Sequence, residues 1–279
     1  MGKGYLNTNS DDYQTNMNAV LHAQQENSDT PAAFNSDLEE IQLPNTITEI
    51  CSNAFDGCQS LKDISIPDSV AKVGRGAFYN CSGLSSENNS FYESENVYYL
   101  GNDVNNYIIA YKVIDSTVSS VEINSNTKFI YDSAFQRCLN LISVEIPKSV
   151  LSIGMSSFRG CESLASITFE VGSQLKTIEK FAFASFPITN TSPWTYNIPV
   201  FETITIPSSV TCIAADAFRR CVNLESVIFE SSNYNDIVTV NDDVNGGSFV
   251  ECWNAKFYYD GDEIPAGEGW KSYANLETL

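Results

Sequence analysis

The chain has 279 residues, of which 43% are hydrophobic and 12% aromatic, so it can bury a substantial core and is not a disordered polymer. Its 35 acidic and 15 basic residues give a formal net charge of −20, and the basic residues are scattered along the sequence, so binding to nucleic acids or to anionic membrane surfaces is not expected. The single histidine, His22, argues against histidine-rich metal sites and against Ser-His-Asp and Cys-His chemistry.

The first 40 residues are predicted to form a tail followed by a capping helix. Residues 11–25 place five side chains on one helical face, and Asp11 and Gln14 have the spacing of a capping box. This face comprises Tyr13, Met17, Val20, Leu21 and Gln24. His22 lies on the same helix without other metal-ligating partners, so a surface or capping role is expected. The N-terminus lacks the apolar segment of a secretion signal, and no run of 18 apolar residues predicts a transmembrane helix.

From residue 41 the sequence repeats itself with a period of 23 residues. Units start at residues 41, 64, 121, 144, 167, 204 and 227, and those at 167 and 227 carry internal insertions. Apolar residues recur at repeat positions 1, 3, 7, 10, 15 and 21, proline at position 4, alanine or serine at 14 and cysteine at 18. Residues between the regular units then form two insertions, at 87–120 and at about 187–200.

Each unit begins with alternating apolar and polar residues, which predict a short half-buried strand, and proline then ends the strand. The remainder of the unit suits a turn and a short helical return. Because one unit cannot bury its apolar face alone, we expect a solenoid of about seven turns with one short parallel strand each. The phenylalanines at position 15 should form an internal stack, and the six cysteines at position 18 should be free, buried thiols rather than disulfides.

The pattern L-x-x-I-x-I-P-x-S-V…I…A-F-x-x-C-x-x-L over residues 41–257 resembles the BspA-like leucine-rich repeat family. The resemblance implies a leucine-rich repeat solenoid with an α/β-type repeat, bounded by the 1–40 segment and by a C-terminal cap at 258–279. It also implies an inserted β-hairpin built from Asn96–Tyr99 and Tyr107–Tyr111. Members are surface or secreted proteins of oral and gut bacteria associated with adhesion and host-protein contact, and no catalytic motif is carried over.

Candidate partner-binding residues come from two sources. In the predicted sheet, the outward-facing row at position 2 is rich in hydroxyls and mildly acidic, and it includes Glu122, Glu145, Thr168 and Thr205. The insertions supply exposed aromatic side chains, which often anchor partners: Tyr98, Tyr107, Trp194 and Tyr196. The alternative for Trp194 and Tyr196 is that they fold back onto the solenoid.

Catalytic and metal-binding readings are weaker. Glu122 and Glu145 lie on consecutive turns, as a glycosidase pair requires, but an exposed ladder of like acids is the common case. The segment 241–246 is similar to half of a calcium loop, but it lacks the first aspartate, and Glu251 is one residue short of the position of the last acid. We therefore expect no catalytic residue, no metal and no cofactor.

The sequence thus favours a non-enzymatic module that binds a protein ligand, such as a host extracellular-matrix or cell-surface protein. We expect it to be secreted or displayed at the cell surface, with its leader removed from this chain; the alternative location is the cytoplasm. Two alternatives in function stay open: a carbohydrate-binding module that uses the aromatic insertions, and a scaffold without a specific ligand.

Overall fold

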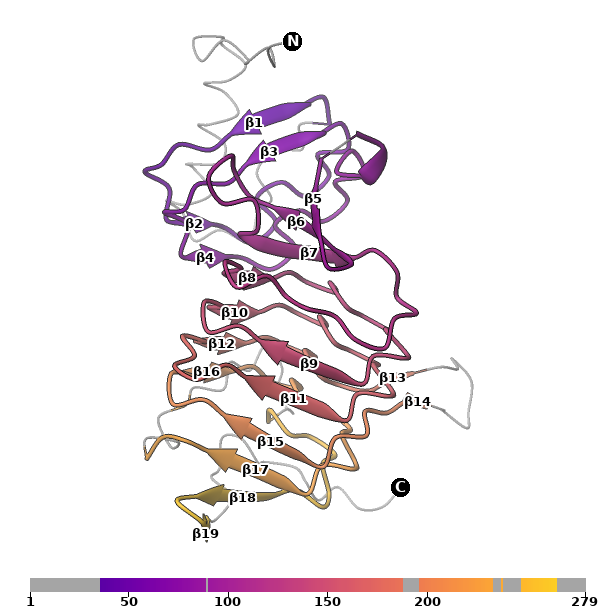
Figure 1. Cartoon of the computed structure of the whole chain (residues 1–279), viewed down its shortest axis with the longest axis vertical. Coiled ribbons are helices and arrows are strands. Elements are labelled where there is room, and N and C mark those ends of the chain that lie inside the picture. The colour runs from indigo at the N-terminus through magenta and orange to yellow at the C-terminus, as the bar shows by residue number, and fades with distance from the viewer. Residues whose placement is uncertain (1–35, 89, 188–195, 233–236, 238–246, 265–279) are drawn as a thin grey trace. The chain divides into compact units, whose positions relative to one another are not determined.

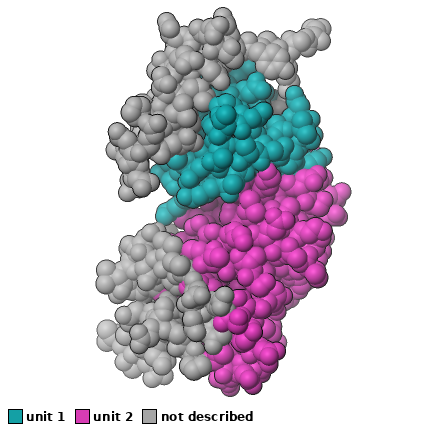
Figure 2. Space-filling model, turned by 90° about the vertical axis from the view of Figure 1, so that its left-hand side faces the viewer, with its two compact units in different colours: residues 1–92, 99–108 teal, residues 93–98, 109–279 magenta. Residues whose placement is uncertain are grey.

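The computed structural model describes residues 36–88, 90–187, 196–232, 237 and 247–264. These residues belong to two compact units (Figure 2): unit 1 comprises residues 1–92 and 99–108, and unit 2 comprises residues 93–98 and 109–279. The predicted capping helix at 11–25 with His22, the calcium-like segment at 241–246, Trp194 and residues 265–279 of the predicted C-terminal cap lie outside the described residues. In the described ranges, no helix has the length and hydrophobicity needed to cross a membrane.

In unit 1, two turns of the repeat pair through parallel strands. The start of the first turn pairs in register with the start of the second, so that Ile41 lies beside Ile64 with both side chains buried. A second, two-residue strand occurs later in each turn, where Ile50 lies beside Val73. The pairs are β1 (Glu40–Gln42) with β3 (Asp63–Ser65) and β2 (Glu49–Ile50) with β4 (Lys72–Val73).

Unit 2 repeats the same arrangement over more turns. Figure 1 shows one row of strands at the starts of its turns and a second row in the later part of each turn. The first row consists of β9 (Ser143–Ile146), β11 (Ser166–Phe169), β15 (Thr203–Ile206), β17 (Ser226–Phe229) and β18 (Lys256–Tyr259). The second consists of β7 (Ile109–Val113), β8 (Phe129–Ile130), β10 (Ser152–Ile153), β12 (Thr177–Ile178) and β16 (Cys212–Ile213). The leucine-rich repeat solenoid is thus confirmed, with the predicted strand at the start of these turns. The turn from residue 121 has only the bridge between Ser120 and Ser143 at its start, and the second row was not predicted.

Both insertions contain hairpins. In the first, a 3-10 turn, η1 (Ser86–Asn88), precedes β5 (Tyr92–Ser94) and β6 (Val97–Leu100). Glu95 and Asn96 join these strands with φ of 48° and 66°, as a two-residue hairpin turn with positive φ at both central positions requires. The predicted hairpin instead joins residues 96–99 to 107–111; these segments overlap β6 and β7, which are hydrogen-bonded neighbours in one sheet, so this pairing is confirmed, and β5 adds an unpredicted strand on the other side of β6. In the second insertion, β13 (Phe186–Pro187) pairs antiparallel with β14 (Tyr196–Asn197) to form a short hairpin.

At the C-terminal end of the described residues, the strand rows continue past residue 257. β18 pairs in parallel with β17, and β19 (Asp262–Glu263) folds back antiparallel onto β18. Asp260 and Gly261, with φ of 51° and 84°, form the turn between them.

The phenylalanines at repeat position 15 form the predicted stack in the core of each unit. Phe55 and Phe78 stack at 5.6 Å in unit 1, and five rings follow one another in unit 2 at 4.7–5.3 Å with interplanar angles of 4–12°. These five are Phe135, Phe158, Phe183, Phe218 and Phe249, none more than 2% exposed. The ring spacing matches the distance of about 4.8 Å between neighbouring strands, so each turn adds one ring to the column.

The cysteines at position 18 are free and buried, as predicted. The structure also gives a reason for their place in the repeat: in four of the six, the thiol donates to the backbone carbonyl of the phenylalanine one turn earlier. Cys81 donates to Phe55 at 2.9 Å and Cys161 donates to Phe135 at 3.1 Å. The carbonyls of Phe55 and Phe135 also accept the backbone N–H of Cys58 and Cys138, so each thiol adds a second, weaker hydrogen bond to a buried carbonyl.

The predicted helical return is wrong. In the described ranges no α-helix occurs, and residues at repeat positions 13 and 17 adopt left-handed backbone conformations instead. At position 13 these are Asn53, Gly76, Ser133, Ser156, Phe181 and Asp216, and at position 17 Gly57, Asn80, Arg137, Gly160, Arg220 and Glu251. Alternate backbone N–H groups there donate to the next turn rather than to their own: Ser133 to Met155 (2.8 Å), Phe135 to Ser157 (2.8 Å) and Arg137 to Arg159 (2.9 Å). A helix would need these donors for bonds within the turn.

Candidate recognition surfaces

The position-2 row of unit 2 lies on one exposed sheet face, which we call the strand face. β9 and β11 pair so that Glu145 lies beside Thr168, while the alternate residue Val144 is buried. The bridge between Ser120 and Ser143 extends the same register to the preceding turn and places Glu122 in line with Glu145. The strand face comprises Glu122, Glu145, Thr168, Thr205, Ile228 and Tyr258. The four residues predicted from the sequence are thus on one face of unit 2.

Side chains on the strand face are available for contacts. Glu122, Glu145 and Thr168 are exposed, and their side chains form no hydrogen bond or ion pair with a residue that the structure describes. Thr205, Ile228 and Tyr258 are half-buried. The row two residues earlier on the same strands adds hydroxyls and one cation: Ser143, Ser166, Thr203, Ser226 and Lys256. The face therefore changes from acidic at Glu122 to aromatic and apolar at Tyr258.

Tyr196 packs against the solenoid. The β13–β14 hairpin places it beside Pro187, and the guanidinium of Arg220 lies 4.1 Å from the centre of its ring. One face of the ring is therefore occupied by a cation, and the side chain is half-buried. This geometry agrees with folding back onto the solenoid, the alternative left open for this residue.

A basic and aromatic cluster surrounds Tyr196, although the sequence suggested scattered basic residues. Arg137 and Arg159 lie 5.0 Å and 5.1 Å from the ring centre of Phe186, and Arg159 lies 4.6 Å from that of Phe181. Lys180 lies 5.3 Å from the same Phe181 ring. Neighbouring turns thus bring together cations that are distant in the sequence.

Two acids neutralise one end of this cluster. Asp216, only 8% exposed, lies 3.8 Å from Arg219 and 3.9 Å from Lys180. Glu251 binds Arg219 at 3.1 Å and also pairs with Arg220. Burial, and then the nearby charge of Arg219, lower the pKa of Arg159, while the charge of Asp216 acts in the opposite direction. The cluster thus holds five cations and two anions around the base of the β13–β14 hairpin.

The two hairpin tyrosines have different roles. Tyr107, in unit 1, packs edge-to-face on the fully buried Tyr99 with ring centres 5.2 Å apart. Tyr98, in β6, belongs to unit 2 and is half-buried. Neither is a fully exposed aromatic anchor of the kind expected from the sequence.

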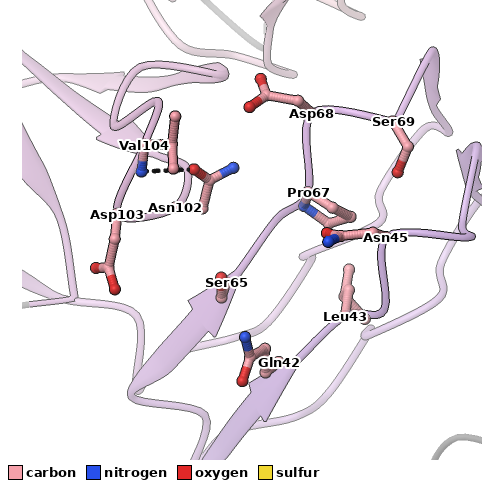
Figure 3. A pocket seen from close by; sticks show the side chains of 10 residues that line it. All are labelled: Gln42, Leu43, Asn45, Ser65, Pro67, Asp68, Ser69, Asn102, Asp103 and Val104. Atoms are coloured by element: carbon pink, nitrogen blue, oxygen red, sulfur yellow. Dashed lines mark hydrogen bonds between the residues drawn. The ribbon is translucent and has the colours of Figure 1, made fainter.

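Unit 1 contains a pocket of about 350 Å³ that the sequence did not predict. Figure 3 shows Asn102, Asp103 and Val104 on one side of it, with Gln42 and Ser65 from β1 and β3 at its base. Gln42 and Ser65 occupy repeat position 2, so the pocket opens on the unit 1 counterpart of the strand face.

The loop that walls this pocket is fixed to the end of β3. Asn102 donates from Nδ2 to the carbonyl of Ile66 at 2.7 Å, and Ile66 donates its N–H to the carbonyl of Gly101 at 2.9 Å. Oδ1 of Asn102 accepts from the N–H groups of Val104 and Asn105, both at 2.8 Å. The wall is therefore held by a side-chain turn of the kind that asparagine favours.

Acidic side chains border the pocket. Nδ2 of Asn105 donates to Asp68 at 3.2 Å. Burial raises the pKa of Tyr92, and the charges of Asp103 and Asp63 and a hydrogen bond with Asp103 raise it further. The potential on this side of unit 1 is therefore negative.

Among the described residues, no group of three or more histidine, cysteine or acidic side chains is placed to hold a metal ion. The acidic run at 260–263 forms the β18–β19 turn, in which Lys256 binds Glu263 at 3.1 Å. The hydrogen bond with Glu263 raises the pKa of Lys256.

Comparisons with known proteins point to one repeat family. The family described as the BspA type leucine-rich repeat region matches in six copies, over residues 30–104, 85–198 and 194–239. Among curated protein sequences, none matches this chain.

The comparison with solved structures finds similar chains, and the first of them supports the solenoid fold. A leucine-rich cell surface protein from Faecalibacterium prausnitzii is 22% identical, with a TM-score of 0.50 over 88% of this chain and 64% of that one. The pneumococcal vaccine antigen PcpA is 20% identical, with a TM-score of 0.46 over 80% of this chain and 62% of its own. A leucine-rich repeat protein from Eubacterium ventriosum is 25% identical, with a TM-score of 0.32 over 70% of this chain and 55% of that one. The chain spans less than two thirds of the length of each.

Proposed function

The chain belongs to the BspA-type leucine-rich repeat family, and we propose that it is a non-enzymatic module that recognises a protein partner through the strand face of unit 2. The observation that carries this proposal is the row of Glu122, Glu145 and Thr168, which are exposed on successive turns and have no partner among the described residues. Stacked repeats present such rows as extended binding surfaces.

The composition of the strand face suits a protein ligand. Its acidic end attracts basic groups, its hydroxyls offer hydrogen bonds, and Ile228 and Tyr258 provide apolar area at the other end. Interfaces combine an aromatic or apolar anchor with a polar rim in this way. Ser226 lies beside Lys256 on this face, but Lys256 is bound to Glu263, which raises its pKa and makes it a poor base; this supports a binding role rather than a catalytic one.

We further propose display at the cell surface or secretion, with a host extracellular-matrix or cell-surface protein as the partner class. The family supports this location, and the F. prausnitzii structure is described as that of a cell surface protein. Binding of a glycan through Tyr196 is less favoured, because Arg220 covers one face of its ring.

The test is a binding screen against immobilised extracellular-matrix and cell-surface proteins, repeated with Glu145→Lys and Thr168→Lys. We expect both variants to lose the interaction while keeping the thermal midpoint of the parent. Glu93→Lys changes an exposed acid of the same unit away from the strand face and should bind as the parent does. Absence of any protein ligand, or a ligand unaffected by both strand-face variants, would refute the proposal.

A further inference from the structure

The pocket of unit 1 has polar groups that the fold does not use. The side chains of Gln42, Asn45 and Ser65 line it and form no hydrogen bond with a described residue. The side chains of Asn102 and Ser69, in contrast, are occupied in holding the walls. A volume of about 350 Å³ is at the lower end of the range of small-ligand sites, so one or two side chains would fill it.

The charge of the pocket excludes anionic ligands. Asp68 and Asp103 line it, and none of the ten lining residues is a lysine or an arginine. Glu40 and Asp63, on β1 and β3, add further negative charge, and the nearby Lys62 is paired with Glu39 at 3.1 Å. A phosphate or carboxylate would therefore meet like charge, whereas the net charge of −20 draws cations toward the chain.

The other lining residues indicate which kind of cationic ligand would fit the pocket. No aromatic ring lines the pocket, so a sugar has no surface on which to stack. Leu43, Pro67 and the 91% exposed Val104 instead offer aliphatic contacts that suit a methylene chain. The acceptor oxygens are spread over several residues, which matches the five N–H donors of a guanidinium better than the three of an ammonium.

We propose that this pocket binds a basic side chain of a protein partner, and an arginine in preference to a lysine. The stem of the side chain lies against Val104 and Pro67, and its charged head meets Asp103 or Asp68. The inference rests on the proposed function only in taking the ligand to be part of a protein. The pocket itself is tested with amino-acid derivatives.

The experiment is an NMR titration of the ¹⁵N-labelled full chain with N-acetyl-arginine amide in the millimolar range, where single side chains bind. Expected shifts are confined to amides that line the pocket, such as Ser65, Asn102 and Val104. N-acetyl-citrulline amide has nearly the same shape without the charge and should cause no shifts. N-acetyl-lysine amide should bind more weakly than the arginine derivative.

Variants connect the shifts to the acids. Asp103→Asn and Asp68→Asn should each weaken binding by roughly threefold, the effect of an exposed charge pair, and Glu87→Gln outside the pocket should not change it. Equal binding of citrulline, or no shifts at the pocket, refutes the site, and equal binding of lysine refutes the arginine preference. Glu145→Lys in unit 2 should leave this titration unchanged, so failure of the pocket and failure of the strand-face proposal are distinguishable.

Discussion

The phenylalanine column of unit 2 predicts a specific penalty for breaking it. Phe158 is fully buried and stacks on Phe135 at 5.0 Å and on Phe183 at 5.3 Å. Replacing a buried phenylalanine by alanine costs about 3–5 kcal/mol of unfolding free energy, because it removes apolar burial and leaves a cavity. Each stacked pair adds about 0.5–1.5 kcal/mol beyond burial. We therefore expect Phe158→Ala to lose about 5 kcal/mol and Phe158→Leu, which retains most of the volume, about 2 kcal/mol.

Urea denaturation followed by circular dichroism measures these losses. The matched control is Phe201→Leu, which changes a 1% exposed phenylalanine of the same unit outside the column. If stacking contributes as argued, Phe158→Leu should be more destabilising than Phe201→Leu. Equal losses would show that the rings contribute only burial, and the reasoning about the column would be wrong.

Four further predictions concern buried groups and single contacts. In the native protein a thiol reagent should label only the two half-buried cysteines outside the repeat register, and all eight after unfolding. Because burial raises the pKa of Cys81 to about 12 from 9.0, the unfolded chain releases this proton first, so stability should fall as the pH rises from 9 toward 12 in denaturation measurements. Gly154→Ala would place a methyl group 2.7 Å from the carbonyl oxygen of Ile130, so we expect a loss of about 2 kcal/mol, and an unchanged thermal midpoint would contradict this packing. Arg220→Met should lower the thermal midpoint because it removes both the cation over Tyr196, a contribution of about 1 kcal/mol, and the ion pair with Glu251, and no change would show that neither contact is stabilising.

The strand row at the starts of the turns, the phenylalanine column and the buried thiols could be predicted because each depends on a recurring residue type at fixed repeat positions. Phe158 and Cys161 belong to columns that recur in nearly every unit, and a recurring apolar residue has only the interior in which to lie. The left-handed residues could not be predicted in the same way. Ser133 and Ser156 adopt φ of 59° and 58° without being glycine, because the hydrogen bonds to the next turn determine their conformation.

The sequence did not predict the basic cluster, because inserted residues interrupt the 23-residue count that would align its members. Arg137 and Arg159 are 22 residues apart and occupy adjacent repeat positions, a relation that could be read from the sequence. Lys180 and Arg220 follow after inserted residues, so counting by 23 no longer places them beside the others. The pocket has no periodic signal, because the contact of Asn102 with Ile66 joins an insertion to the regular repeat.

The alternation of buried and exposed side chains along each strand allows residues of the binding surface to change without changing the core. Along β9, Val144 and Ile146 face the core while Glu145 faces solvent, so a change at position 2 alters the strand face without altering the packing behind it. Inserted segments are not bound by the period, and they bring side chains to places that the repeat alone leaves open. Asn102 walls a pocket over β3, and Tyr196 meets Arg220. A regular strand row therefore supplies an extended, adjustable surface, whereas the insertions add local shape and charge, and the specificity of each unit for its ligand should depend on both.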